Sequence, residues 1–226
     1  MITLITPTGG RPEAFALCER YMARQSVRFN QWIVVDDCKK PTRCTMGQEI
    51  IRPDTFWQEG DMTLPRNISL ALEQVKYDNI LIIEDDDWYH PDYIKTLVEK
   101  LEKFDIVGEG HARYYNVANY GHMIHQNNTH ASLCMTGFSS RVLEQVKTCV
   151  EKNIGQKFLD IEIWKLPVRK LVYRDSLTCV GIKGMKGRGG IGYGHKGSFG
   201  SPDAAPFYTL RKWIGNDAEF YEALCK

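Results

Sequence analysis

Four consecutive carboxylates follow an apolar run in the stretch "NILIIEDDDWYHPDY", where Glu84, Asp85, Asp86 and Asp87 come directly after residues 80–83. Adjacent negative charges repel one another, and capping the next helix would need only one aspartate. Carboxylate oxygens are the ligands that hard cations such as Mn²⁺ or Mg²⁺ prefer, and a carboxylate can also accept hydrogen bonds from ribose hydroxyls. The stretch therefore predicts a metal-binding or ribose-binding site at the end of a buried strand.

Two earlier apolar runs also end in polar residues. The segment "MITLIT" leads into Thr6, Pro7 and Thr8, and "QWIVVDD" ends on Asp36 and Asp37. Helix-like patterns follow all three runs, over residues 12–25, 65–77 and 91–104, each with a proline near its start. Uniformly apolar strands that alternate with helices favour a mostly parallel sheet covered on both faces, whose ligands bind at the carboxyl ends of the strands.

The second half of the chain has a less regular pattern. Residues 104–126 favour paired short strands, residues 133–138 a further strand, and residues 139–152, 158–166 and 207–224 favour helices. We find no internal repeat and no linker-like stretch, so we expect a single domain over residues 1–226. The fold class is α/β, with three layers and an added hairpin region.

Composition narrows the class of protein. The chain is 43% hydrophobic and 25% charged, which is typical of soluble globular proteins, and no apolar run is long enough to cross a membrane. The N-terminus lacks the features of a signal peptide, and seven scattered cysteines indicate neither a disulfide framework nor a zinc site. We therefore expect a cytoplasmic protein, in the host cytoplasm if it is phage-encoded.

Charge is distributed unevenly along the chain. Residues 165–212 contain ten basic and two acidic residues, a net +8, so the rest of the chain carries −7 of the overall +1. An acidic part and a basic part suit a metal ion and a polyanionic ligand bound between them. The alternative is an ordinary solvated basic face.

The order of these segments resembles that of GT-A glycosyltransferases, most of all the inverting family 2 type, over about residues 1–175. The acids followed by "WYHPDYI" resemble the DXD motif of that family. The resemblance implies a GT-A, Rossmann-like three-layer fold, with residues 1–105 binding a nucleotide sugar and residues 106–226 binding the acceptor. It also implies a UDP-linked sugar as donor, Mn²⁺ or Mg²⁺ as cofactor, and an inverting single displacement.

The resemblance also implies roles for individual residues. In the first half, Asp85 falls on the ribose-contacting position and Asp86 on the metal ligand, with Glu84 as an alternative first acid of the motif. The other donor-binding candidates in this half are Thr6, Pro7, Thr8, Arg11, Asp36 or Asp37, Arg66 and Asn67. In "FLDIEIW", Asp160 falls on the catalytic base, and Glu162 is the alternative, although the two point in different directions on a helix.

The glycine-rich segment over residues 183–200 contains a GxGxxG spacing, but no helix-forming sequence follows, so a dinucleotide site is disfavoured. We interpret it as a loop whose cations Lys183, Lys186 and Arg188 close over a diphosphate. His195 near the end of this loop could complete the metal ligands, as a late histidine does in several GT-A enzymes.

The acceptor is the least constrained part of this prediction. The +8 segment suits a hydroxymethylated pyrimidine in DNA, as in phage base-modifying glucosyltransferases, and the aromatic and histidine residues around 111–122 could stack on the acceptor. A saccharide of lipopolysaccharide or capsule is the alternative. Among other classes, a sugar nucleotidyltransferase is disfavoured because "TPTGGRP" lacks a lysine. A non-catalytic nucleotide-sugar or nucleic-acid binding module would not need a carboxylate placed as Asp160 is.

Overall fold

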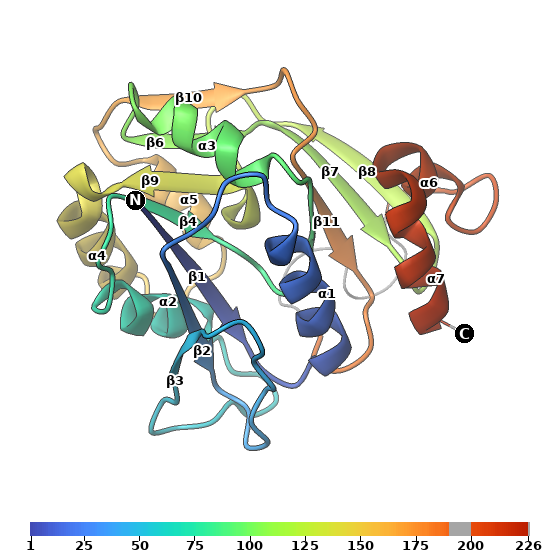
Figure 1. Ribbon diagram of the computed structural model, residues 1–226, viewed down its shortest axis with the longest axis horizontal. Helices are drawn as coiled ribbons and strands as arrows, with labels where there is room; N and C mark the ends of the chain where they lie inside the picture. The colour runs from blue at the N-terminus through green and yellow to red at the C-terminus, as the bar shows by residue number, and fades with distance from the viewer. Residues whose placement is uncertain (190–199, 226) are drawn as a thin grey trace.

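The computed structural model describes residues 1–189 and 200–225, and it places a seven-stranded sheet at the centre of the fold (Figure 1). The strand order is β10-β6-β9-β4-β1-β2-β3, and all pairs are parallel except those that β9 makes with β4 and β6. The strands are β1 (Ile2–Thr8), β2 (Gln31–Asp36), β3 (Glu49–Ile51), β4 (Asn79–Ile82), β6 (Ile106–Glu109), β9 (Thr136–Ser139) and β10 (Lys170–Tyr173).

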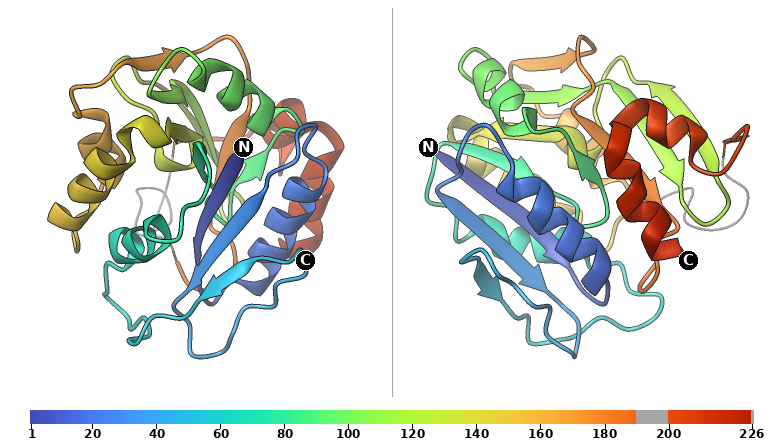
Figure 2. Two further views of the ribbon diagram at one scale, coloured as in Figure 1. Left: turned by 60° about the vertical axis from the view of Figure 1, so that its left-hand side comes forward. Right: turned by 45° about the vertical axis from the view of Figure 1, so that its right-hand side comes forward.

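Helices cover both faces of this sheet, as Figure 2 shows, with α2, α4 and α5 on one face and α1 and α3 on the other. The helices are α1 (Pro12–Ala23), α2 (Leu64–Leu72), α3 (Tyr93–Leu101), α4 (Leu143–Lys152), α5 (Leu159–Trp164), α6 (Tyr208–Ile214) and α7 (Ala218–Cys225). Short 3₁₀ turns lie at η1 (Leu133–Met135), η2 (Ser140–Val142) and η3 (Gly215–Asp217). Proline in the first turn starts α1 and α2, as expected from its fixed φ. The three-layer α/β prediction is confirmed.

A second sheet, of order β12-β8-β7-β11-β5, packs beside the first. Its strands are β5 (Trp88–Tyr89), β7 (His111–Asn116), β8 (Gly121–Gln126), β11 (Cys179–Lys183) and β12 (Ser201–Pro202). The antiparallel pair β7–β8 is the hairpin region expected from the sequence. Strand β5 directly follows the four acids and pairs with β11, so the acids lie where the two sheets meet.

The core explains why the strands of the first half are continuously apolar. Every residue of β1 and β2 is buried, and so are Ile80, Leu81 and Ile82 of β4. Burial on both faces leaves the strand ends as the place where polar side chains can reach a ligand. Among the described residues, no helix is long and apolar enough to cross a membrane.

Candidate active site

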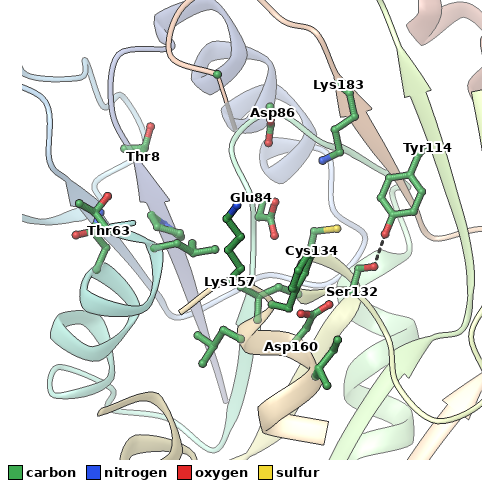
Figure 3. Close-up of a pocket in the computed structure, with 18 of the residues that line it drawn as sticks. Thr8, Thr63, Glu84, Asp86, Tyr114, Ser132, Cys134, Lys157, Asp160 and Lys183 are labelled. Atoms are coloured by element: carbon green, nitrogen blue, oxygen red, sulfur yellow. Dashed lines mark hydrogen bonds between the residues drawn. The ribbon is translucent and has the colours of Figure 1, made fainter. Parts of the chain in front are cut away.

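A cavity of about 370 Å³ opens where the carboxyl ends of β1 and β4 face β7 and β8 of the second sheet (Figure 3). Both halves of the chain contribute to its wall. The first half supplies Pro7, Thr8, Arg11, Thr63, Asn67, Glu84 and Asp86, and the second half supplies Tyr114, His125, Ser132, Asp160, Lys183 and Arg188, among others.

The four acids do not all face this cavity. Glu84 and Asp86 line it, whereas Asp85 is buried outside its wall. Asp85 accepts a hydrogen bond of 2.5 Å from the Thr8 hydroxyl and pairs with the Arg11 guanidinium. The geometry therefore gives the cavity-facing position to Glu84 and not to Asp85, whose carboxylate fixes the loop after β1.

Two cations from different elements balance the acids in part. Arg11 at the start of α1 contacts Asp86 at 2.6 Å as well as Asp85, and Lys183 at the end of β11 lies 3.9 Å from Asp87. Burial alone would lower the pKa of Lys183, but the neighbouring carboxylates, Asp87 foremost, raise it above its ordinary value. With all four carboxylates ionised, two negative charges would exceed the charge of these two cations.

The remaining charge fits a divalent cation. Carboxylate oxygens of Glu84, Asp86 and Asp87 all lie within 4.8 Å of one another, so an all-oxygen ligand set of the kind that Mg²⁺ and Mn²⁺ prefer is available. Burial, and then the charge of Asp87, raises the pKa of Glu84 to about 8, and burial raises the pKa of Asp87 to about 6. A cation at this point would relieve both costs. The sequence did not predict Asp87 as a ligand.

Asp37, at the end of β2, is the centre of a second polar cluster. Its buried carboxylate accepts from Thr63 Oγ1 at 2.5 Å, Asn67 Nδ2 at 2.8 Å and Arg66 Nη2 at 3.5 Å. It also pairs with Arg188 Nη1 at 2.5 Å. The structure thus brings together Asp37, Arg66, Asn67 and Arg188, but Asp37 itself is not part of the cavity wall. Arg188 lies at this cluster and not over the four acids.

Several predicted donor-binding residues lie elsewhere. Asp36 is buried and holds the loop after β2 through Thr42 N and Arg52. The Thr6 hydroxyl accepts from Trp32 Nε1 at 2.9 Å in the core. Lys186 lines a separate, smaller pocket beside Cys225. His195 is outside the described residues.

The two candidate catalytic bases, Asp160 and Glu162, lie in different surroundings. Asp160, in the first turn of α5, lines the cavity, and burial raises its pKa. Glu162 is outside the wall and pairs with Lys165 at 2.7 Å on the surface. Of the two carboxylates, the cavity therefore receives that of Asp160.

Thr63 and Lys157 are among the cavity residues that sequence reasoning missed. Thr63 is the residue before α2, and its hydroxyl donates to Asp37. Lys157 extends toward Glu84 (Figure 3). Neither belongs to a recognisable motif, although Thr63 precedes a Leu-Pro helix start and Lys157 comes three residues before Asp160.

Much of the basic segment is used within the fold. Lys165 pairs with Glu162, Arg169 with Asp105, and Arg211 with Glu222. Lys183 and Arg188 face the cavity. The uneven charge of the sequence therefore brings cations to the acidic strand ends of the first half.

A mostly parallel sheet lies between two layers of helices, carboxylates follow β4, and a second sheet lies across the cavity. This arrangement defines the GT-A class of fold. The family model described as glycosyl transferase family 2 matches residues 3–160, and the chain belongs to that family.

Solved structures with a similar fold include TarS from S. aureus. This chain is 13% identical to TarS with a TM-score of 0.59, and the match covers 80% of this chain and 36% of TarS. Residues 1–349 of TarS in complex with UDP-GlcNAc match with a TM-score of 0.52 and 13% identity, over 80% of this chain and 58% of that one. The chain thus spans less than two thirds of either structure, and at this identity the likeness concerns the fold. Comparison with curated protein sequences gave no match.

Proposed function

We propose that this protein transfers a sugar from a UDP-sugar to an acceptor hydroxyl by an inverting single displacement that depends on Mn²⁺ or Mg²⁺. The observation that carries the proposal is that Asp160, a half-buried carboxylate whose pKa is raised, shares one cavity with Glu84 and Asp86. Membership of glycosyl transferase family 2 supports the reaction type. The similar fold of TarS residues 1–349, a structure in complex with UDP-GlcNAc, supports the donor.

The donor half, residues 1–105, would hold the nucleotide across its strand ends. We place the nucleobase at the Asp37 cluster after β2 and the diphosphate at the acids after β4, where Glu84, Asp86 and Asp87 would hold the cation and Lys183 adds a positive charge. A cation held there would neutralise the charge of the departing diphosphate.

Asp160 acts on the acceptor side. Its carboxylate removes the proton of the acceptor hydroxyl as that oxygen forms a bond to the anomeric carbon. The bond between the anomeric carbon and the diphosphate breaks, and its electron pair leaves with the diphosphate. Burial raises the pKa of Asp160, which makes its carboxylate a stronger general base than an exposed aspartate.

For the acceptor we propose a hydroxymethylated pyrimidine in DNA, because the acceptor wall is aromatic. Tyr114 and His125 lie edge to face at 5.9 Å in that wall, and Phe158, 55% exposed at the rim, holds a positive φ of 61° two residues before Asp160. An exposed ring on a backbone held at positive φ suits a stacking contact with a base. The internal pairing of Lys165, Arg169 and Arg211 favours the second candidate, a lipopolysaccharide or capsule saccharide.

The experiment measures release of free nucleoside diphosphate from UDP- and GDP-sugars, with Mn²⁺ or with EDTA, and with hydroxymethylated DNA or a saccharide as acceptor. We expect EDTA to abolish turnover and Asp160→Asn to lower kcat by about 10²- to 10⁴-fold. The matched control Glu162→Gln, a surface carboxylate two residues away, should stay within about twofold, as surface substitutions usually do.

Equal losses in Asp160→Asn and Glu162→Gln, or turnover indifferent to EDTA, would contradict the proposal. The dependence of turnover on salt concentration distinguishes a DNA acceptor from a saccharide acceptor. Contacts to several phosphates weaken steeply as salt rises, whereas binding of a neutral saccharide does not.

A further inference from the structure

Arg188 reaches the donor half from the far side of the cavity. It follows β11 of the second sheet, and its backbone N–H donates to the carbonyl of Gly10 at 3.2 Å. The neighbouring Gly187 has a φ of +101°, and a Cβ there would lie 2.4 Å from the Gly10 carbonyl oxygen. Only glycine permits this close approach, so the segment is built to lie against the loop after β1.

The guanidinium of Arg188 is held on three sides. It pairs with Asp37 Oδ1 at 2.5 Å, donates to Thr63 Oγ1 at 2.7 Å and lies 4.5 Å from the centre of the Trp57 ring. These contacts use two of its five N–H groups, and the residue lines the cavity. A donor-only group is therefore presented to the cavity in a fixed orientation.

The carboxylate of Asp37, in contrast to the guanidinium of Arg188, does not face the cavity. Its Oδ2 accepts from Thr63, Asn67 and, at 3.5 Å, Arg66, its Oδ1 accepts from Arg188, and its side chain is fully buried outside the cavity wall that Arg188 lines. A nucleobase that reached Asp37 would have to displace Arg188. It would replace the pairing of two opposite charges by a hydrogen bond from a neutral N–H, and the guanidinium would lose its carboxylate partner.

We propose that Arg188 is the residue that reads the nucleobase of the donor, and that Asp37 is a positioning residue that holds its guanidinium. This inference rests on the proposed function, in which the donor is a nucleotide sugar. Because a guanidinium only donates, it selects a base edge that offers carbonyl oxygens. Uracil offers O4 where cytosine offers an amino group, so the geometry favours UDP over CDP.

The test measures binding of UDP, CDP and inorganic pyrophosphate by isothermal titration calorimetry with Mn²⁺ present. We expect Arg188→Met to weaken UDP binding at least tenfold, to bring the affinities for UDP and CDP together, and to leave pyrophosphate binding unchanged. Arg188→Lys, which keeps the positive charge but not the planar guanidinium, should lose the same discrimination between UDP and CDP. The control Arg43→Met removes an exposed cation of the donor half and should bind like wild type.

Two outcomes would overturn the inference. Tighter UDP binding by Arg188→Met would mean that Arg188 blocks Asp37, and a parallel loss of UDP and pyrophosphate would mean that Arg188 holds the diphosphate. Failure of the wild-type protein to bind UDP or CDP at all would instead contradict the proposed function and remove the basis of the inference with it. Melting curves show whether each variant is folded, and Arg188→Lys decides the matter if Arg188→Met is not.

Discussion

The uncompensated charge of the four acids predicts how stability depends on pH when no divalent cation is bound. Burial, and then the charge of Asp87, raises the pKa of Glu84 in the folded protein from 4.5 to about 8. Between these two values the folded state binds a proton that the unfolded chain releases. The contribution of Glu84 is therefore fully present below about pH 4.5 and is lost as the pH rises to about 8.

The size of this loss follows from the same values. A rise from 4.5 to about 8 corresponds to at most about 5 kcal/mol at 1.36 kcal/mol per pH unit, and because Asp85 and Asp87 share the repulsion we expect about 2–4 kcal/mol. For a chain of 226 residues each kcal/mol shifts Tm by roughly 2–4 °C, so Tm in EDTA should fall by about 4–16 °C between pH 5 and pH 8.

The assay is thermal unfolding in EDTA across this pH range, for the wild type, Glu84→Gln and the control Glu59→Gln at an exposed site. Burial also raises the pKa of Glu109 to about 7, which acts in the same direction. The difference between wild type and Glu84→Gln, and not the raw slope, is therefore the quantity to compare. Glu84→Gln should flatten the dependence, Glu59→Gln should not, and Mn²⁺ should raise Tm more at pH 8 than at pH 5. A Tm that is flat or rises with pH in EDTA, or a Glu84→Gln curve that matches wild type, would refute the reasoning.

Two further predictions concern stability. Gly108→Ala would place a Cβ 2.4 Å from the Ala131 Cβ, so we expect overpacking to cost about 1–3 kcal/mol in urea unfolding, whereas Gly189→Ala, whose Cβ would have no atom of the described residues within 4 Å, should unfold like wild type. Asp105→Asn should cost about 1 kcal/mol at pH 7, because the hydrogen bond from Arg141 holds the pKa of Asp105 at about 2 and its arginine partners are partly exposed. The difference in unfolding free energy between wild type and Asp105→Asn should disappear as the pH falls from about 4 to 2. A difference that persists at pH 2 would show that the ion pairs of Asp105 are not its cause.

The strand ends of the first half could be predicted because their signal is local. Continuous apolar runs give β1, β2 and β4, and a proline in the first turn marks the starts of α1 and α2. That Asp160 and Glu162 have different surroundings was also predictable in kind, since side chains two apart on a helix point in different directions. Which of the two faces the cavity depends on how α5 packs, and that is tertiary information.

The orientation of the four acids and the position of Arg188 were not accessible to this reasoning. Which acid faces the cavity depends on Thr8 and Arg11, which take up the Asp85 carboxylate from another strand end. The pairing of Arg188 with Asp37 joins residues 151 positions apart. Periodicity and motif spacing report neighbours along the chain, so they carry no information about such a contact.

One short segment of the second sheet therefore serves both ends of the cavity. Lys183 at the end of β11 lies by Asp87, and Arg188, five residues later, pairs with Asp37. Strand β5 pairs with β11 directly after the acids, so the position of β11 is fixed by the residues that follow the acids in the chain. The charge asymmetry of the sequence thus has a structural explanation: the basic part of the chain supplies cations to two buried acidic strand ends, and a nucleotide bound across them would meet both cations on one segment.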